Sequence, residues 1–114
     1  MKKYCLALDL KNDPASITGY EKWHQQVWPE IKQSIIDSGI RKMEIYRTGN
    51  RLFMIMETTD AFNFESKAKS DKNNPKVVAW EELMWEYQKP LPWAKEGKKW
   101  LLMNRIFELD AHED

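Results

Sequence analysis

The 114-residue sequence predicts an α+β fold of the ferredoxin-like type, in which helices cover one face of an antiparallel sheet. Three observations lead to this prediction. A strand pattern, a long helix pattern and a two-strand hairpin pattern follow one another in the first half of the chain. A helical region and a final apolar run make up the second half, so the order is βαββαβ, that of the split βαβ fold. A chain of this length holds one core, and we expect residues 1–114 to form a single domain.

The first half begins with a strand and a long helix. Residues 4–10 alternate between large apolar and smaller or polar side chains, which predicts a strand. Apolar positions at helical spacing over residues 17–35 predict a helix, and Gly39 ends it. Pro29 interrupts this helix, because its ring clashes with the carbonyl four residues earlier and it has no N–H to donate. We therefore expect a break near residue 28 and Pro29 as the first residue of a second helical segment.

The remaining elements are a hairpin, two helices and a last strand. Gly49-Asn50 is a two-residue loop that tolerates positive φ angles, so residues 41–48 and 52–58 are expected to pair as antiparallel strands. The charged turn at residues 95–99 is expected in solvent. The other expected elements are a short helix at 61–69, a helix at 75–88 that Pro90 and Pro92 end, and a strand at 100–109 buried on much of both faces.

The predicted sheet has a second face that helices of so short a chain do not cover. A second subunit packing sheet to sheet would cover it and would close the two sheets into a dimeric α+β barrel. We therefore expect a homodimer.

Composition excludes several classes of partner. Lys plus Arg equals Asp plus Glu at 18 each, so the chain lacks the basic excess that drives binding to nucleic acid or anionic lipid, and a small ligand without strong charge is expected. No stretch is apolar enough to cross a membrane, and the N-terminal apolar run is too short for a signal peptide. Cys5 is the only cysteine, which excludes an internal disulfide and favours the cytoplasm. The sequence contains no metal-ligand spacing of His and Cys residues, so no metal is expected.

His24 is the main candidate for proton transfer, since an imidazole titrates near neutrality and the only other histidine, His112, lies close to the C-terminus. Tyr20 is four residues earlier, which places its hydroxyl on the same helix face. If the helix breaks before Pro29, His24 lies in the last turn of the first segment, where the helix dipole favours the imidazolium. We accordingly expect a pKa not far below that of a free imidazole. Without further evidence, however, an isolated histidine on an apolar helix face is more often a hydrogen-bonded core residue than a catalyst.

Tryptophan is unusually frequent, with six residues in a short chain. An indole stacks on the C–H face of a sugar and also suits subunit interfaces, so some of the six are expected to face a ligand or a partner. Trp28 is assigned mainly to the helix break, and Trp85, Trp93 and Trp100 to the core and the dimer interface.

A set of features from residue 20 to residue 80 agrees in order and spacing with one known family. These features are Tyr20-x-x-x-His24-x-x-x-Trp28-Pro29-Glu30, the Gly39 stop, Met43-Glu44-Ile45-Tyr46 and Trp80. The chain thereby resembles the L-rhamnose mutarotase family over nearly its whole length. The resemblance implies a dimeric α+β barrel and interconversion of the α and β anomers of a 6-deoxy-hexose, a reaction that needs no cofactor.

The resemblance also implies roles for particular residues. His24 would be the acid/base at the ring or anomeric oxygen, Tyr20 a neighbouring hydrogen-bonding or relay group, and Trp80 a stacking wall for the sugar. The chain departs from the best-known members at Met43, where they carry an aromatic residue, and at Trp80-Glu81, where they carry a Trp-Trp pair. Glu81 would add an acceptor for a sugar hydroxyl. The family name favours L-rhamnose, and the departures keep L-fucose as the alternative.

Three further residues are secondary candidates for sugar binding. Tyr46 belongs to the strand that carries the resemblance, while Asp9 and Arg105 are polar positions within apolar runs, where an ion pair is an equally good interpretation. Two other functions remain open. A cofactor-independent monooxygenase or haem-binding barrel would use His24 as base or ligand, and a non-catalytic sugar-binding module would use the tryptophans alone.

Overall fold

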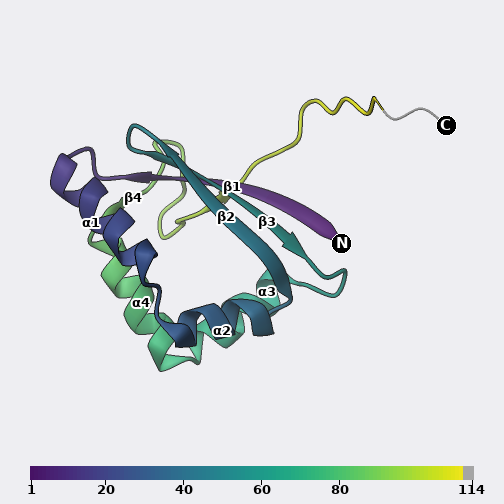
Figure 1. Ribbon diagram of the computed structural model, residues 1–114, viewed down its shortest axis with the longest axis horizontal. Helices are drawn as coiled ribbons and strands as arrows, with labels where there is room; N and C mark the ends of the chain where they lie inside the picture. The colour runs from purple at the N-terminus through teal and green to yellow at the C-terminus, as the bar shows by residue number, and fades with distance from the viewer. Residues whose placement is uncertain (112–114) are drawn as a thin grey trace.

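The computed structural model describes residues 1–111 and confirms the α+β fold, with an antiparallel sheet and helices on one of its faces (Figure 1). The sheet order is β2-β3-β1-β4, and β5 also pairs with β1. The elements are β1 (Lys2–Leu10), α1 (Pro14–Gln25), α2 (Pro29–Asp37), β2 (Ile40–Thr48), β3 (Arg51–Thr58), α3 (Phe64–Lys72), α4 (Pro75–Trp85), β4 (Gln88–Lys89) and β5 (Leu101–Leu102).

The break in the first helical region lies where the sequence predicts it. α1 ends at Gln25, and Pro29 is the first residue of α2, with Trp28 in an extended conformation before it. Asp13 caps α1 by accepting a hydrogen bond from the Ser16 N–H at 2.8 Å. The break turns α2 away from α1, so the two helices form different parts of the layer that covers the sheet (Figure 1).

The hairpin is also confirmed. β2 and β3 pair in antiparallel register up to Thr48 and Arg51, and Gly49 adopts φ +55° in the loop between them. Gly39, at φ +102°, ends α2 and starts β2. The alternation predicted for β1 is correct as well, because its large apolar side chains and those of β3 are buried in the core: Leu6, Leu8, Leu10, Leu52, Met54 and Met56.

The predicted strand at residues 100–109 is wrong for most of its length. The edge of β1 that β3 does not occupy is shared by two short strands, with Leu10 opposite Gln88 and Leu6 opposite Leu102. The prolines that follow β4 cannot donate backbone hydrogen bonds, so the chain leaves the sheet at residue 90 and returns only at β5. Beyond β5 the chain runs away from the body (Figure 1), and Ile106 is 95% exposed. His112 lies outside the described residues.

Two helix boundaries also differ from the sequence prediction. The helix expected at 61–69 spans Phe64–Lys72, because Asn63 caps it by accepting from the Ser66 N–H at 3.0 Å. The helix expected to reach residue 88 ends at Trp85, and Gln88 instead belongs to β4. This second difference matters for the site, because it turns Gln88 toward the interior.

The sheet face opposite the helices carries small and apolar side chains at its centre. Cys5 is opposite Ile55 and Ala7 is opposite Phe53 across β1 and β3, and all four side chains are partly exposed. No helix within residues 1–111 has the length and apolar character needed to cross a membrane.

Candidate active site

A cavity of about 530 Å³ lies between the covered sheet face and the helices. This volume is in the range of small-molecule sites. Its floor is made by apolar side chains of the sheet, including Met43, Ile45 and Met54, and its walls carry the polar and aromatic groups Tyr20, His24, Trp80, Gln88, Lys99 and Trp100. A second cavity of about 470 Å³, between α3 and α4, is more open and is not lined by a histidine.

The neutral His24 ring is held in one tautomer by its own helix. Its Nδ1 lies 2.9 Å from the Tyr20 carbonyl oxygen. A carbonyl can only accept, so Nδ1 carries the proton and the Nε2 lone pair lies on the other side of the ring. Burial lowers the pKa of His24, and the backbone hydrogen bond opposes this only in part. The direction of this shift is opposite to the one expected from the helix dipole, and burial of the ring is its largest cause.

Tyr20 lies against His24, as its spacing predicts. The two ring centroids are 4.2 Å apart and the rings are inclined by 33°. Burial raises the pKa of Tyr20 to about 12; the nearby Glu81 charge adds to the rise, and the side chain of Gln88 opposes it. The hydroxyl therefore stays protonated across the physiological range and is available as a donor beside a neutral imidazole.

Trp80 is the centre of the aromatic wall. Its ring meets the His24 ring at 5.8 Å, the Trp28 ring at 5.1 Å and the Trp23 ring at 6.2 Å, each in an edge-on arrangement. Trp23 is fixed in turn because its indole N–H donates to the Tyr87 hydroxyl at 3.1 Å. Trp28 thus supports the wall by packing against Trp80, in addition to preceding the helix break, but does not itself line the cavity.

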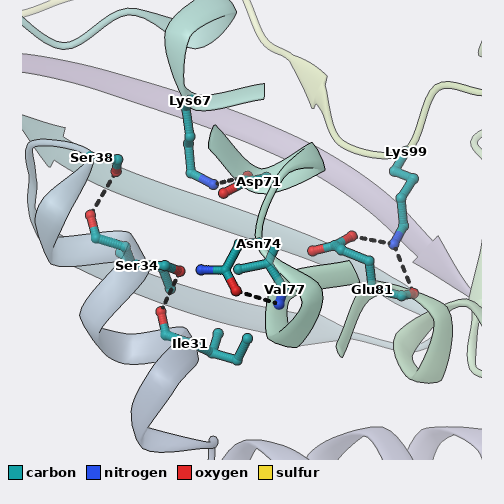
Figure 2. A network of polar contacts seen from close by, with 10 residues as sticks. Ile31, Ser34, Ser38, Lys67, Asp71, Asn74, Val77, Glu81 and Lys99 are labelled. Carbon is teal, nitrogen blue, oxygen red and sulfur yellow. Dashed lines mark hydrogen bonds and ion pairs between the residues drawn. The ribbon is translucent and has the colours of Figure 1, made fainter. Parts of the chain in front are cut away.

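The charged turn at residues 95–99 is exposed up to residue 98, as expected, but its last three residues also line the cavity and Lys99 is not in solvent. Figure 2 shows Lys99 reaching from the segment before β5 to Glu81 on α4, where its Nζ lies 2.6 Å from the carboxylate. The same Nζ lies 4.7 Å from the centre of the Trp85 ring, and the Lys99 side chain is only 15% exposed. Glu81 is at the cavity as predicted, but its charge is paired with that of Lys99.

A second ion pair stands at the rim of the cavity, between Lys67 and Asp71 of α3 (Figure 2). Each of the two rim carboxylates therefore has an ammonium partner. The lining also includes the exposed Lys98, so three ammonium groups stand against two carboxylates. The charges at the rim largely offset one another, which suits a polar, uncharged ligand.

Three residues predicted for sugar binding lie outside the cavity. Tyr46 is on the opposite sheet face from Met43, is 53% exposed, and donates to Glu44 at 3.0 Å. Asp9 is buried and accepts two hydrogen bonds from the Arg51 guanidinium, at 2.7 and 3.1 Å. Arg105 lies on the exposed C-terminal segment and pairs with Glu108 at 2.7 Å. The ion-pair interpretation of Asp9 is thus correct, with Arg51 as the partner.

Sequence reasoning missed Gln88, Lys99 and Trp100. Gln88 was assigned to a helix end, and Lys99 to a solvent turn. Pro90 and Pro92 were the available signal, because a helix that must stop before them leaves a short extended segment for the free edge of β1. No local signal connects Lys99 with Glu81, 18 residues away. Within residues 1–111 no group of three or more His, Cys, Asp or Glu side chains is placed to hold a metal ion.

The fold and the cavity define a class: small α+β proteins that hold a ligand between helices and sheet, here with a neutral imidazole, a phenol and an indole around a site suited to proton transfer. Residues 3–109 match the model of the L-rhamnose mutarotase family, and the chain belongs to this family. It is therefore an isomerase of the sugar mutarotase type, which interconverts anomers.

Relatives named as sugar mutarotases support the same assignment. The chain is 43% identical to an L-fucose mutarotase of Xanthomonas campestris pv. campestris over 96% of its own length and 89% of the relative. It is 32% identical to an L-rhamnose mutarotase of Phocaeicola vulgatus over 76% of each chain.

Solved structures agree on the fold. The L-rhamnose mutarotase of Formosa agariphila superposes with a TM-score of 0.71 at 19% identity and covers 96% of this chain and 100% of its own. The tetracenomycin F2 cyclase of Streptomyces glaucescens superposes with a TM-score of 0.65 at 14% identity, with 98% and 100% covered. Because the cyclase shares the fold, the fold alone does not specify the reaction.

Proposed function

We propose that this protein interconverts the anomers of a 6-deoxy-hexose in the cavity between helices and sheet, with His24 as the acid/base. The observation that carries the proposal is the hydrogen bond from His24 Nδ1 to the Tyr20 carbonyl, which leaves the basic Nε2 lone pair on the other side of a ring that lines the cavity. The burial that lowers the pKa of His24 keeps this base neutral at pH 7.

The reaction needs one proton removed and one supplied. His24 Nε2 takes the proton of the anomeric hydroxyl as the bond between C1 and the ring oxygen breaks and the aldehyde forms. The ring oxygen receives a proton through the Tyr20 hydroxyl, which is protonated because its pKa is raised to about 12. After rotation about the C1–C2 bond the hydroxyl adds to the other face of the aldehyde, and the two proton transfers run in reverse. Trp80 supplies an apolar wall for the C–H face of the sugar.

L-Fucose and L-rhamnose are the candidate substrates. The greater identity to the L-fucose mutarotase, 43% against 32%, makes L-fucose the first sugar to test, whereas the family name favours L-rhamnose. The paired charges at the rim support an uncharged monosaccharide in either case.

Saturation-transfer NMR between the α and β anomeric protons tests this function on both sugars. We expect wild type to accelerate exchange, and His24→Gln to lose about 10²–10⁴-fold of the catalysed rate. Gln25→Ala, an exposed change at the next position of the same helix, is the matched control and should keep the wild-type rate. Binding without faster exchange would indicate a non-catalytic module, and full activity in His24→Gln would exclude His24 as the acid/base.

We also propose a homodimer formed through the sheet faces that no helix covers. The row of Cys5, Ala7, Phe53 and Ile55 supports this interface, because it presents an apolar strip at the centre of that face. Sedimentation at micromolar concentration should give the mass of two chains, and a Phe53→Lys variant should sediment as one. A monomeric wild type would remove the proposal. The unpaired thiol of Cys5 supports a cytoplasmic location.

A further inference from the structure

Gln88 is a buried polar side chain with an unmet hydrogen bond. The residue is 5% exposed, its backbone is fixed by the pairing of β4 with β1, and its side chain lines the cavity. Its Oε1 is the one buried side-chain nitrogen or oxygen atom within residues 1–111 that lacks a hydrogen-bond partner.

An unmet acceptor in this position is unfavourable for folding alone. Buried polar atoms without partners are rare in native proteins, because a group removed from water loses hydrogen bonds that nothing replaces. A methionine would fill similar space without this loss, and methionines already line other parts of the same cavity, at Met54 and Met56. The amide at residue 88 therefore points to a ligand that supplies the missing donor.

Tyr20 lies beside the amide, and the Gln88 side chain lowers the pKa of the Tyr20 hydroxyl. The Tyr20 hydroxyl does not donate to Oε1, because that oxygen has no partner. Turning the amide over would exchange the unmet acceptor for an unmet donor, and a sugar hydroxyl satisfies either one because it both donates and accepts.

This arrangement, which rests on the proposed function, selects one hydroxyl of the sugar. The hydroxyls on C2 and C4 are equally near the ring oxygen, but His24 and Tyr20 act on the two oxygens bonded to C1, and the C2 hydroxyl is the one on the neighbouring carbon, which favours it as the partner of the amide. That hydroxyl is equatorial in L-fucose and axial in L-rhamnose. We propose that Gln88 is a specificity-determining residue whose amide hydrogen-bonds the C2 hydroxyl of the sugar.

The experiment compares sugars that differ only at one hydroxyl. Anomer exchange rates and dissociation constants are measured for L-fucose and L-rhamnose and for their 2-deoxy and 4-deoxy analogues, with wild type, Gln88→Met and the control Lys89→Met. Lys89 is the exposed neighbour in the same strand. Wild type and the control should prefer each parent sugar over its 2-deoxy analogue by about tenfold to a hundredfold, because a site built around a hydroxyl discriminates against its absence. Gln88→Met should reduce this preference to about twofold or less.

Stability supplies a readout that does not depend on catalysis. Gln88→Met removes the unmet acceptor, so its melting temperature should equal or exceed that of wild type. A marked fall would show that the amide serves the fold and would overturn the proposal. So would a Gln88→Met variant that keeps the full preference for the C2 hydroxyl, or a wild type that discriminates only at C4. If wild type binds these sugars without exchanging them, the proposed function fails, and the ratio of dissociation constants still tests Gln88.

Discussion

Removing the indole of Trp80 should destabilise the protein strongly, whereas the same change at Trp93 should not. Trp80 is 6% exposed and meets three rings edge-on, while Trp93 is 65% exposed. Each such ring pair contributes about 0.5–1.5 kcal/mol beyond burial. Three pairs therefore contribute roughly 1.5–4.5 kcal/mol. With the cavity left by truncation, Trp80→Ala should lower the free energy of unfolding by about 3–5 kcal/mol.

Urea denaturation followed by far-UV circular dichroism measures this difference without relying on tryptophan fluorescence. Trp93→Ala should change the free energy of unfolding by about 1 kcal/mol or less. Trp80→Phe retains one ring and should lose less than Trp80→Ala, which keeps the comparison informative if the alanine variant does not fold. Equal losses at Trp80 and Trp93 would refute the packing of the aromatic wall, and with it the placement of His24 against Trp80.

The remaining predictions concern protonation, packing and the charged rim. Because burial lowers the pKa of His24, its neutral form persists as pH falls, so the acid limb of kcat/KM should lie below pH 6.5; a limb above that value would contradict the role of desolvation. The free energy of unfolding should also decline as pH falls below 6.5, because His24 binds a proton more readily in the unfolded chain than in the folded protein. In Gly19→Ala the new Cβ would lie 2.6 Å from Tyr87 Cε1. The cost of overpacking, about 1–3 kcal/mol, should exceed the gain in helix propensity of about 1 kcal/mol, so the free energy of unfolding measured in urea should fall. A rise in the free energy of unfolding would show that the Tyr87 ring moves aside freely. Lys99→Met should leave stability within about 1 kcal/mol, since Glu81 is half exposed, but should raise KM by up to about fivefold; an unchanged KM would show that the ion pair plays no part in shaping the site.

Local patterns were sufficient for much of the fold. The period-2 alternation at residues 4–10 and the Gly49-Asn50 loop identify strands without reference to the rest of the chain, because side-chain direction and turn geometry are properties of neighbouring residues. Pro29 located the helix break for the same reason. The i, i+4 spacing of Tyr20 and His24 likewise placed two candidate groups on one helix face, where their rings indeed pack together.

Predictions from apolar composition were wrong where the burial of a segment depends on other parts of the fold. The apolar pattern of residues 100–109 predicts a buried strand, yet only Leu101–Leu102 pairs with β1, and residues 102–109 are exposed. Arg105, predicted at the site from its setting in that apolar run, lies on the exposed C-terminal segment, and Tyr46, predicted from the resemblance, projects from the sheet face opposite the cavity.

The sequence by itself therefore determined the class of fold, the position of the helix break and the pairing of Tyr20 with His24, since each is encoded within a few residues. Only the tertiary structure decided that His24 is neutral, that Lys99 is held at Glu81 and that Gln88 faces the cavity with an unmet hydrogen bond. These properties arise from desolvation and from contacts between residues distant in the chain, and both exist only once the helices have closed over the sheet.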